Sequence, residues 1–412
     1  MDLGWGPPFV RKIKFKFHRS LYFDMELSQI SQRFTESVIR EMTRVAKATP
    51  NCINLAQGFP DFAAPEDIKQ AAIEAIRNDI NQYSITWGSK NLRSAIATKV
   101  KKFNHINVDT EKNITVTCGA TEAMIASLKA IINPGDEVVI FEPFYENYGP
   151  DCLLSGATPR FIRLNAPDWT YDEDALTKLF TKKTKAIIIN TPNNPTGKVF
   201  SEKEMKFIAN LCIQHNTIAI TDEIYEHIVF DGAQHISIAS LPEMQDRSIT
   251  INSISKTYSV TGWRVGWALA SDKITAEIKK VHDFLTVGAA APLQEAAAYA
   301  LSLGDDYYTH LHDFYQRARD IMFKALQQTD LHPYNPKGAY YMMTECQDYM
   351  QRNHLKTSLE LALHLIKQIG IATVPGSSFF NDPKNGQALT RFCFCKKDQT
   401  LAEAQARLQK LR

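Results

Sequence analysis

The chain has 412 residues, 44% of them hydrophobic and 22% charged, a composition typical of a folded protein with roughly two to three domains. Its 47 Lys and Arg residues nearly balance its 45 Asp and Glu residues, so the charge gives no reason to expect nucleic acid or a membrane surface as the main partner. The richest apolar stretch, residues 288–304, contains Pro292, Gln294 and Glu295, which excludes a membrane-spanning helix there.

The seven cysteines are an odd number and form no C-x-x-C pair, which argues against a disulfide framework and against a zinc site. We therefore expect free thiols, no metal, and a reducing, cytoplasmic compartment. The cysteines are Cys52, Cys118, Cys152, Cys212, Cys346, Cys393 and Cys395.

The N-terminal segment differs in composition from the rest of the chain. Residues 1–20 carry five Lys and Arg residues against one acidic residue, Asp2, and lack the apolar core of a secretory signal. We expect residues 1–30 to be a disordered basic leader. A transit peptide and a start of translation at Met25 are the alternatives.

From about residue 70, short apolar runs alternate with helical patterns. The run KAIIIN at 185–190 is apolar on both faces, which indicates a sheet covered by helices on both sides. The alternation predicts an α/β fold with a mostly parallel sheet. Strands are predicted at 114–117, 137–141, 185–190, 217–221 and 248–252, and helices at 121–132 and 201–215.

The next strand, 265–270, is expected to run antiparallel to strand 248–252. Only about a dozen residues separate the two strands, and a parallel crossover needs that many for its helix alone. This gap instead holds a loop with Lys256 and Gly262.

After about residue 300 the pattern changes. Two long helical stretches, 305–328 and 358–369, precede a last strand at 389–395 and a terminal helix. This pattern predicts a second, α+β domain, and the absence of a Gly/Ser linker indicates that the two domains pack closely.

Polar residues follow the predicted strands at their carboxyl ends, the edge where ligands bind in open α/β sheets. The four segments are 119–121, 190–197, 222–225 and 253–256. Each has an ordinary interpretation alone, such as a helix cap, a turn or a solvated lysine. Their joint occurrence, each at a strand end, indicates a binding site.

One cofactor explains the whole set. A lysine shielded from water at a strand end, here Lys256, can form a Schiff base with an aldehyde, and pyridoxal 5'-phosphate is the common aldehyde cofactor. That cofactor needs a carboxylate at its ring nitrogen, donors at its phenolic oxygen, a phosphate cup and an aromatic ring on its face. The candidates are Asp222 for the nitrogen, Asn194 and Tyr225 for the phenolic oxygen, Gly119, Ala120, Thr121, Ser253 and Arg264 for the phosphate, and Phe144 or Tyr145 for stacking.

From about residue 33 to its end, the chain resembles the pyridoxal-phosphate-dependent aminotransferases of class I, fold type I. Within that class it is most similar to the kynurenine, glutamine and methionine aminotransferase-like branch. The matching segments are NLAQGFPDF (54–62), NQYSITWG (81–88), TVTCGATEA (115–123), FEPFYENY (141–148), NTPNNPTGKVF (190–200), TDEIYEHI (221–228), SISKTYSVTGWRVGW (253–267), KVHDFLT (280–286) and TRFCF (390–394).

The resemblance implies a role for individual residues. Lys256 would hold the cofactor and then move the proton, Tyr145 would stack on the ring, and Arg391 would bind the substrate α-carboxylate as a bidentate fork. Gly58 would lie on the substrate loop with Asn194 nearby. The catalytic set is then Lys256, Asp222 and Tyr225.

The resemblance also implies an architecture. It consists of a large domain (65–300) with a mostly parallel seven-stranded sheet between helices, and a small domain built from both chain ends (31–64 and 301–412). Tyr83 would reach the cofactor phosphate of a neighbouring subunit, which implies a homodimer with shared active sites.

The expected reaction is a ping-pong transfer of an amino group between an L-amino acid and a 2-oxo acid. Aspartate-preferring members of the class supply a second arginine where this chain has Ala290, and residues 286–298 contain no Lys or Arg. We therefore expect methionine, glutamine, leucine or aromatic amino acids as donors rather than aspartate.

Three alternatives remain. A cysteine-conjugate carbon–sulfur β-lyase or an aspartate-type aminotransferase could use the same scaffold. A non-enzymatic aminotransferase-like regulator would need a DNA-binding module before the matching region, and about 30 residues are too few to form one.

Overall fold

A computed structural model describes residues 26–411, and the chain divides into two compact units, Met1–Thr35 and Glu36–Arg412. In the first unit, the described residues are mostly exposed and include a 3-10 helix, η1 (Ser31–Arg33). The predicted basic leader, residues 1–30, lies largely outside the described residues. Within 26–411, no helix is long and apolar enough to cross a membrane.

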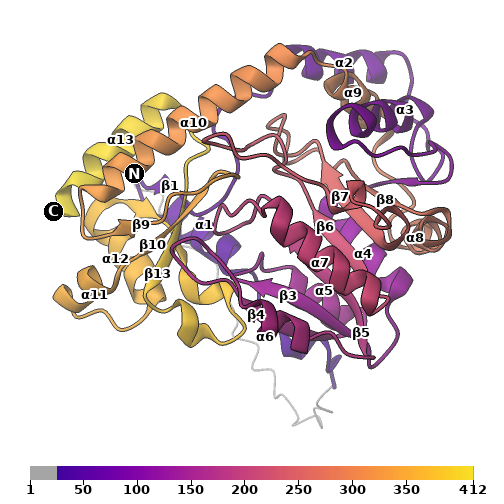
Figure 1. The fold of residues 1–412 in the computed structure, drawn as a ribbon. Helices are drawn as coiled ribbons and strands as arrows, with labels where there is room; N and C mark the ends of the chain where they lie inside the picture. Colours follow the sequence, from indigo (N-terminus) through magenta and orange to yellow (C-terminus); the bar gives the residue numbers. More distant parts are fainter. Residues whose placement is uncertain (1–25, 412) are drawn as a thin grey trace, which may run out of the picture. The chain divides into compact units, whose positions relative to one another are not determined.

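A seven-stranded sheet forms the centre of the second unit (Figure 1). Its strand order is β2-β8-β7-β6-β5-β3-β4, and only β8 runs antiparallel to its neighbours, β2 and β7. The predicted mostly parallel sheet and its antiparallel strand are confirmed. The strands are β2 (Ile114–Thr117), β3 (Glu137–Glu142), β4 (Thr158–Arg163), β5 (Thr184–Asn190), β6 (Ile218–Asp222), β7 (Ser248–Ser253) and β8 (Gly266–Ala270).

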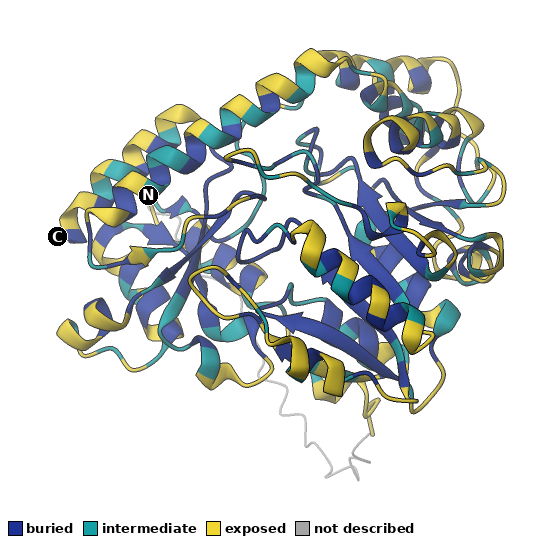
Figure 2. Ribbon diagram, viewed as in Figure 1, coloured by how far each residue is buried: buried dark blue, intermediate teal, exposed yellow. Residues whose placement is uncertain are grey.

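Helices cover both faces of this sheet. Successive side chains of a strand point to opposite sides, so each strand packs against helices on both faces. In β5, Ile188 packs with side chains of α4, α5 and α8, whereas Ile187 packs with side chains of α1, α6 and α7. Figure 2 shows the strands buried between these layers. The helices are α1 (Val38–Ala48), α4 (Ala120–Ile131), α5 (Tyr148–Leu154), α6 (Glu173–Lys178), α7 (Glu202–Gln214) and α8 (Asp272–Leu285).

A third cluster of helices packs beside the β2 edge of the sheet. It contains α2 (Glu66–Arg77), α3 (Lys90–Lys99) and α9 (Ala291–Leu301), whose apolar side chains meet Val116 and Trp267. The π-helical turn η2 (Val100–Asn104) extends α3.

The C-terminal region forms a separate four-stranded sheet in the order β12-β13-β10-β9. A parallel pair, β1 (Ile53–Asn54) with β11 (Ile371–Ala372), brings an early segment beside a late one. The boundaries predicted for a large and a small domain stay predictions. The remaining elements are β9 (His332–Pro333), β10 (Tyr341–Glu345), β12 (Val374–Pro375), β13 (Leu389–Cys393), α10 (Asp305–Gln327), α11 (Gln347–Arg352), α12 (Ser358–Ile369) and α13 (Asp398–Leu408).

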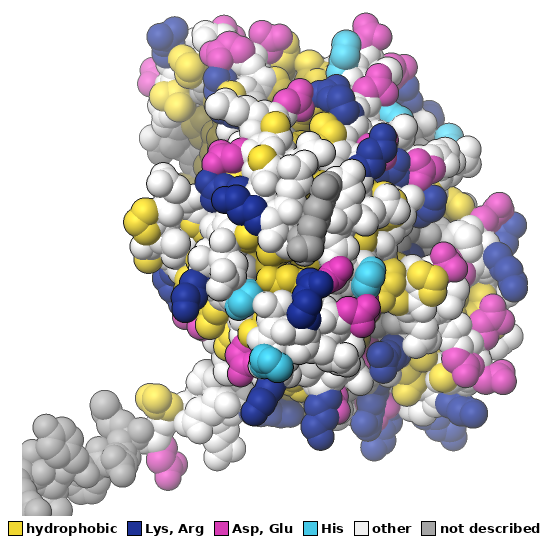
Figure 3. Space-filling view, turned by 90° about the vertical axis from the view of Figure 1, so that its left-hand side faces the viewer, with side chains coloured by type: hydrophobic (Ala, Val, Ile, Leu, Met, Phe, Trp, Pro, Cys, Tyr) yellow, Lys and Arg dark blue, Asp and Glu magenta, His cyan; other side chains and the backbone are white. Residues whose placement is uncertain are grey.

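On the face turned to the viewer in Figure 3, basic and acidic side chains are intermixed and no single sign dominates. This mixture agrees with the formal net charge of +2. Such a face gives no electrostatic reason to bind a polyanion.

Candidate active site

Two cavities that share lining residues lie at the carboxyl ends of the parallel strands. The narrower has a volume of about 110 Å³ and the wider about 710 Å³. Thr121, Asn194, Lys256 and Arg264 line both, so the predicted strand-end segments do converge. Ala120, Asp222, Tyr225 and Ser253 line the narrower cavity, whereas Gly58 and Arg391 line the wider one, and Tyr145 lines both.

Asp222 is the last residue of β6 and is buried at the floor of the narrower cavity. Burial raises the pKa of its carboxyl group to about 6, although a hydrogen bond from Tyr148 acts against that rise. In that bond Tyr148 Oη donates to Oδ2 of Asp222 over 2.7 Å. The hydrogen bond therefore holds the carboxylate in one orientation. A cationic partner inside the cavity would stabilise its ionised form.

Lys256 follows β7 and places its ammonium group at the junction of the two cavities, where Nζ donates to the carbonyl of Gly58 over 3.2 Å. Loss of hydration lowers the pKa of this amine to about 8. Arg264 and Arg391 lower the pKa further, and Asp222 acts in the opposite direction. Near neutral pH an appreciable fraction of Lys256 is therefore an uncharged amine, which is the form that attacks an aldehyde.

Tyr225 and Asn194 reach the cavities from different loops. The Tyr225 hydroxyl lies 3.0 Å from that of Tyr341. Asn194 is fixed through its backbone, because its N–H donates to Asn190 Oδ1 over 2.7 Å. Two polar groups are thus presented on short, buried loops.

The start of α4 forms an anion cup. Its first N–H groups, at Ala120 and Thr121, have no acceptor within the helix, as at every helix N-terminus. Gly119 precedes them with a φ of +83°, and a Cβ at this position would lie 2.3 Å from Nη2 of Arg264. Glycine is therefore needed for the guanidinium of Arg264 to approach the helix end.

Arg391 on β13 is fully buried. Its Nη1 donates to Oδ1 of Asn194 over 2.7 Å, and its guanidinium stacks 4.2 Å from the ring centroid of Tyr341. Within residues 26–411 it makes no ion pair, and its buried Nε has no hydrogen-bond partner. A buried guanidinium without a carboxylate is costly, so this position suits an anionic ligand.

The remaining predicted residues differ in position. Tyr145 lines both cavities, whereas Phe144, the second candidate for stacking, is in the core beside Phe161. A Cβ on Gly58 would lie 1.9 Å from the Tyr341 hydroxyl, so a larger residue would not fit there. Tyr83 is 88% exposed and lines neither cavity.

Sequence reasoning missed several residues that line the cavities, among them Arg40 and three polar residues of the narrower cavity. Tyr148 and Asp151 come from α5, and Tyr341 comes from β10. Burial raises the pKa of Asp151 to about 7, and its Oδ2 has no partner among the described residues. No sequence pattern singled out Tyr148, because Tyr145 lies in the loop before α5 and Tyr148 is the first residue of that helix.

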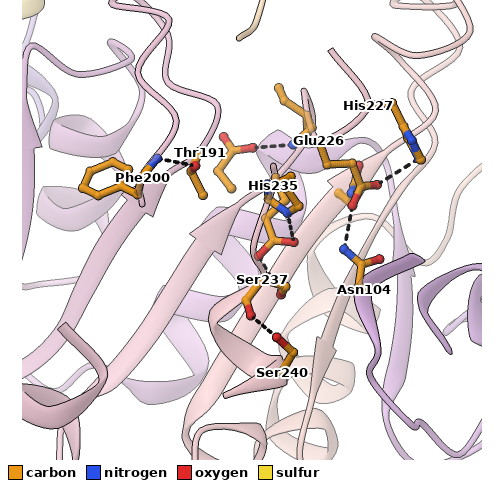
Figure 4. A network of polar contacts seen from close by, with 12 residues as sticks. Asn104, Thr191, Phe200, Glu226, His227, His235, Ser237 and Ser240 are labelled. Carbon is orange, nitrogen blue, oxygen red and sulfur yellow. Dashed lines mark hydrogen bonds and ion pairs between the residues drawn. The ribbon is translucent and has the colours of Figure 1, made fainter. Parts of the chain in front are cut away.

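A buried polar network is centred on Glu223 and Glu226, the sequence neighbours of Asp222 and Tyr225 (Figure 4). Glu226, next to Tyr225, accepts from Lys99, from Asn104 over 2.8 Å and from Asn252 over 2.6 Å. Glu223, next to Asp222, accepts from Ser237 and contacts His235. Ligand atoms of Glu223, Glu226 and His235 lie within 4.8 Å of one another, but the Lys99 ammonium already neutralises Glu226.

Comparisons with known proteins identify the family to which the chain is similar. The family model "Aminotransferase class I and II" matches residues 50–408. The chain is 36% identical over 389 residues to kynurenine–oxoglutarate transaminase 1 of Homo sapiens, covering 87% of this chain and 92% of the relative. It is 35% identical over 375 residues to methionine aminotransferase of Escherichia coli (strain K12), with coverages of 91% and 96%. The fold matches the structure of N-succinyldiaminopimelate aminotransferase from Mycobacterium tuberculosis with a TM-score of 0.89 and 35% identity, over 94% of this chain and 100% of that one.

Proposed function

The chain belongs to the class I and II aminotransferases, and we propose that it works in the cytoplasm as a homodimer on neutral and aromatic L-amino acids. It is a pyridoxal-phosphate-dependent enzyme that moves an amino group from an L-amino acid to a 2-oxo acid in two half-reactions. The cytoplasmic location is supported by the seven cysteines, all of which are free thiols.

The residues present fit the cofactor. The cradle at Gly119, which a side chain would fill, suits a phosphate between the start of α4 and Arg264. The buried carboxylate of Asp222 lacks a cationic hydrogen-bond partner among the described residues and suits a protonated ring nitrogen. When bound, pyridoxal phosphate supplies an electrophilic aldehyde and an electron-accepting ring.

The cofactor-holding roles follow from these positions. We assign the phosphate to Ala120, Thr121, Ser253 and Arg264, and ring stacking to Tyr145. Asn194 and Tyr225 would hold the phenolic oxygen, so that Tyr225 also tunes the electronic state of the ring. We assign Tyr83 to the cofactor phosphate in the site of a second subunit, because it is exposed and lies outside both cavities of its own chain.

Two residues act on the substrate. Arg391 binds the α-carboxylate and orients the α-carbon toward Lys256. The uncharged amine of Lys256 would accept the substrate α-proton, and the ammonium group so formed would hold that proton for its return. The position of Lys256 at both cavities and its lowered pKa carry this assignment, because only an uncharged amine can accept the α-proton.

Lys256→Ala tests the assignment, with Lys279→Ala as the control because Lys279 is also partly shielded but lines neither cavity. We expect Lys256→Ala to lose at least about 10³-fold in kcat. Borohydride reduction of the loaded wild type should add the mass of the reduced cofactor to the peptide with Lys256. Near-normal turnover of Lys256→Ala, or a label on another lysine, would contradict the assignment.

The dimer is supported by exposed apolar side chains on two segments that contact each other. Phe284 is 92% and Tyr83 is 88% exposed, and Nε2 of His282 lies 2.8 Å from the carbonyl oxygen of Thr86. Ile85, Leu285 and Val287 on the same segments are also exposed, and a group of exposed apolar side chains of this kind is typical of a surface that meets a partner. Phe284→Asp should dissociate the dimer in sedimentation experiments, whereas Leu363→Asp, an exposed leucine on α12, should not.

A further inference from the structure

The wider cavity is strongly cationic. Of the charged side chains that line it, Arg40, Lys256, Arg264 and Arg391 are cationic. Glu122 is the acidic one, and it is neutralised by His282, whose Nδ1 lies 2.7 Å from its Oε1. The proposed function gives a task to three of the four cations and leaves Arg40 without one.

Arg40 is held at the cavity by the start of α1. The N-cap Ser37 donates its hydroxyl to Glu146 over 2.5 Å, and the N–H of Ile39 donates to the same carboxylate over 3.3 Å. Glu146 follows Tyr145 directly, so the first turn of α1 is tied to the loop that carries the stacking ring. These contacts between α1 and Glu146 place Arg40 near Tyr145.

The electrostatics agree with this placement. Burial raises the pKa of Tyr145 to about 12, and the positive charge of Arg40 acts against that rise. The guanidinium of Arg40 makes no ion pair with any residue in 26–411. Arg44, one helical turn later, pairs with Glu36 at 2.5 Å. Arg40 interacts with Glu36 only at longer range, where its charge helps to lower the pKa of that carboxyl group after the larger effect of Arg44. Arg40 is thus a cation at the cavity without a direct ion pair among the described residues.

We propose that Arg40 binds the distal carboxylate of a dicarboxylic 2-oxo acid, the amino acceptor, while Arg391 binds its α-carboxylate. This inference rests on the proposed function. A ping-pong enzyme must admit two different side chains into one site. Because Arg40 is exposed, it stays hydrated when a neutral side chain is bound, so a neutral donor does not leave a buried, unpaired charge.

The test compares Arg40→Ala and Arg40→Gln with Arg44→Ala, an arginine on the same helix outside both cavities. Single-turnover half-reactions would use 2-oxoglutarate and the 2-oxo acid of methionine. Because Arg40 is exposed, we expect a loss of kcat/KM for 2-oxoglutarate of up to about fivefold in both Arg40 variants. The kcat/KM for the neutral acid should be unchanged in both Arg40 variants. Arg44→Ala should keep the wild-type kcat/KM for both acids.

A binding measurement separates recognition from chemistry. Calorimetry on the cofactor-loaded protein would compare glutarate with pentanoate, which has the same length and one carboxylate. Arg40→Ala should weaken the binding of glutarate by up to about fivefold and leave the binding of pentanoate unchanged. Equal losses for both ligands, or no loss, would overturn the role of Arg40. Absence of any transamination by the wild type would instead overturn the proposed function.

Discussion

Tyr148 donates a 2.7 Å hydrogen bond to the carboxylate of Asp222, and both side chains line the narrower cavity. The bond favours the ionised form of Asp222, whereas burial favours the neutral form and raises the pKa to about 6. Tyr148 therefore decides how much of the carboxylate is ionised near neutral pH. If Asp222 pairs with the cofactor's ring nitrogen as proposed, Tyr148 acts as a positioning residue for cofactor binding.

Tyr148→Phe should shift the pH dependence of cofactor binding. Affinity requires ionised Asp222 and is lost as the pH falls through the pKa of this group. Removal of the hydrogen bond raises that pKa, so affinity should be lost at a pH about one unit higher. The dissociation constant of pyridoxal phosphate, measured with cofactor-free protein from about pH 5 to about pH 8, would show the shift.

Tyr171→Phe is the matched control. The Tyr171 hydroxyl is buried without a hydrogen-bond partner among the described residues and lies outside both cavities. Its removal should leave the pH profile unchanged. Coincident profiles for the two variants would show that Tyr148 does not set the ionisation of Asp222.

Gly119→Ala should impair the anion cup. The φ of +83° is strained for alanine, and the new Cβ would lie 2.3 Å from Nη2 of Arg264. We expect at least about a tenfold weaker binding of pyridoxal phosphate and a loss of about 1–3 kcal/mol in unfolding free energy. Gly232→Ala serves as the control and should retain affinity, because Gly232 has a similar φ of +74° but nothing within 4 Å of a Cβ, and it lines neither cavity. Unchanged affinity in Gly119→Ala would argue against a phosphate at this helix end.

Most strands could be predicted from the sequence because they are buried on both faces and so consist of continuous apolar residues. β4 is different. It is an edge strand with an exposed, polar pattern and Pro159, and it is formed by its parallel pairing with β3. The direction of β8 was predictable because the gap after β7 is too short for a crossover helix.

The candidate site was predictable where its residues follow strands, since strand ends converge whatever the packing of the helices. Asp222 and Lys256 belong to this group. Tyr148 and Arg40 lie in helices, and whether a helical residue faces a cavity depends on how its helix packs. That packing depends on contacts distant in sequence, such as Glu146 with Ser37, which no local pattern shows.

Glu226→Gln should destabilise the protein through Lys99. Burial alone would raise the pKa of Glu226, but Lys99, His227 and His235 outweigh it and bring the pKa to about 2. Loss of the negative charge leaves the buried ammonium group of Lys99 unpaired. We expect the free energy of unfolding, measured with urea, to fall by about 3–5 kcal/mol. The double variant Lys99→Met with Glu226→Leu should recover only part of this loss, because the side-chain amides of Asn104 and Asn252 still lose their acceptor. A double variant no more stable than Glu226→Gln would contradict the ion-pair argument.

The pH dependence of stability gives a second measure of the same pair. The folded-state pKa of Glu226, about 2, lies below the unfolded value, so its stabilisation is present above about pH 4 and is lost as the pH falls toward 2. The wild type should lose this increment on acidification, whereas Glu226→Gln lacks it at every pH. Parallel stability curves for the two proteins in this range would contradict the low pKa.

The amino donor should be neutral or aromatic rather than aspartate. The segment after α8 that leads into α9 offers Val287, Gly288 and Ala289 and no cation, and Leu285 and Thr286 line the wider cavity. An aspartate side chain buried against these residues would keep an unpaired charge, whereas a thioether or aromatic side chain gains from burial. Arg40 offsets part of this cost only from an exposed position, where a charge pair contributes about 1 kcal/mol or less.

We expect kcat/KM for methionine and phenylalanine to exceed that for aspartate by roughly 30-fold, which corresponds to about 2 kcal/mol. Donor half-reactions measured at one pH with the same enzyme would decide it, and a clear preference for aspartate would contradict the pocket argument while leaving the aminotransferase assignment intact.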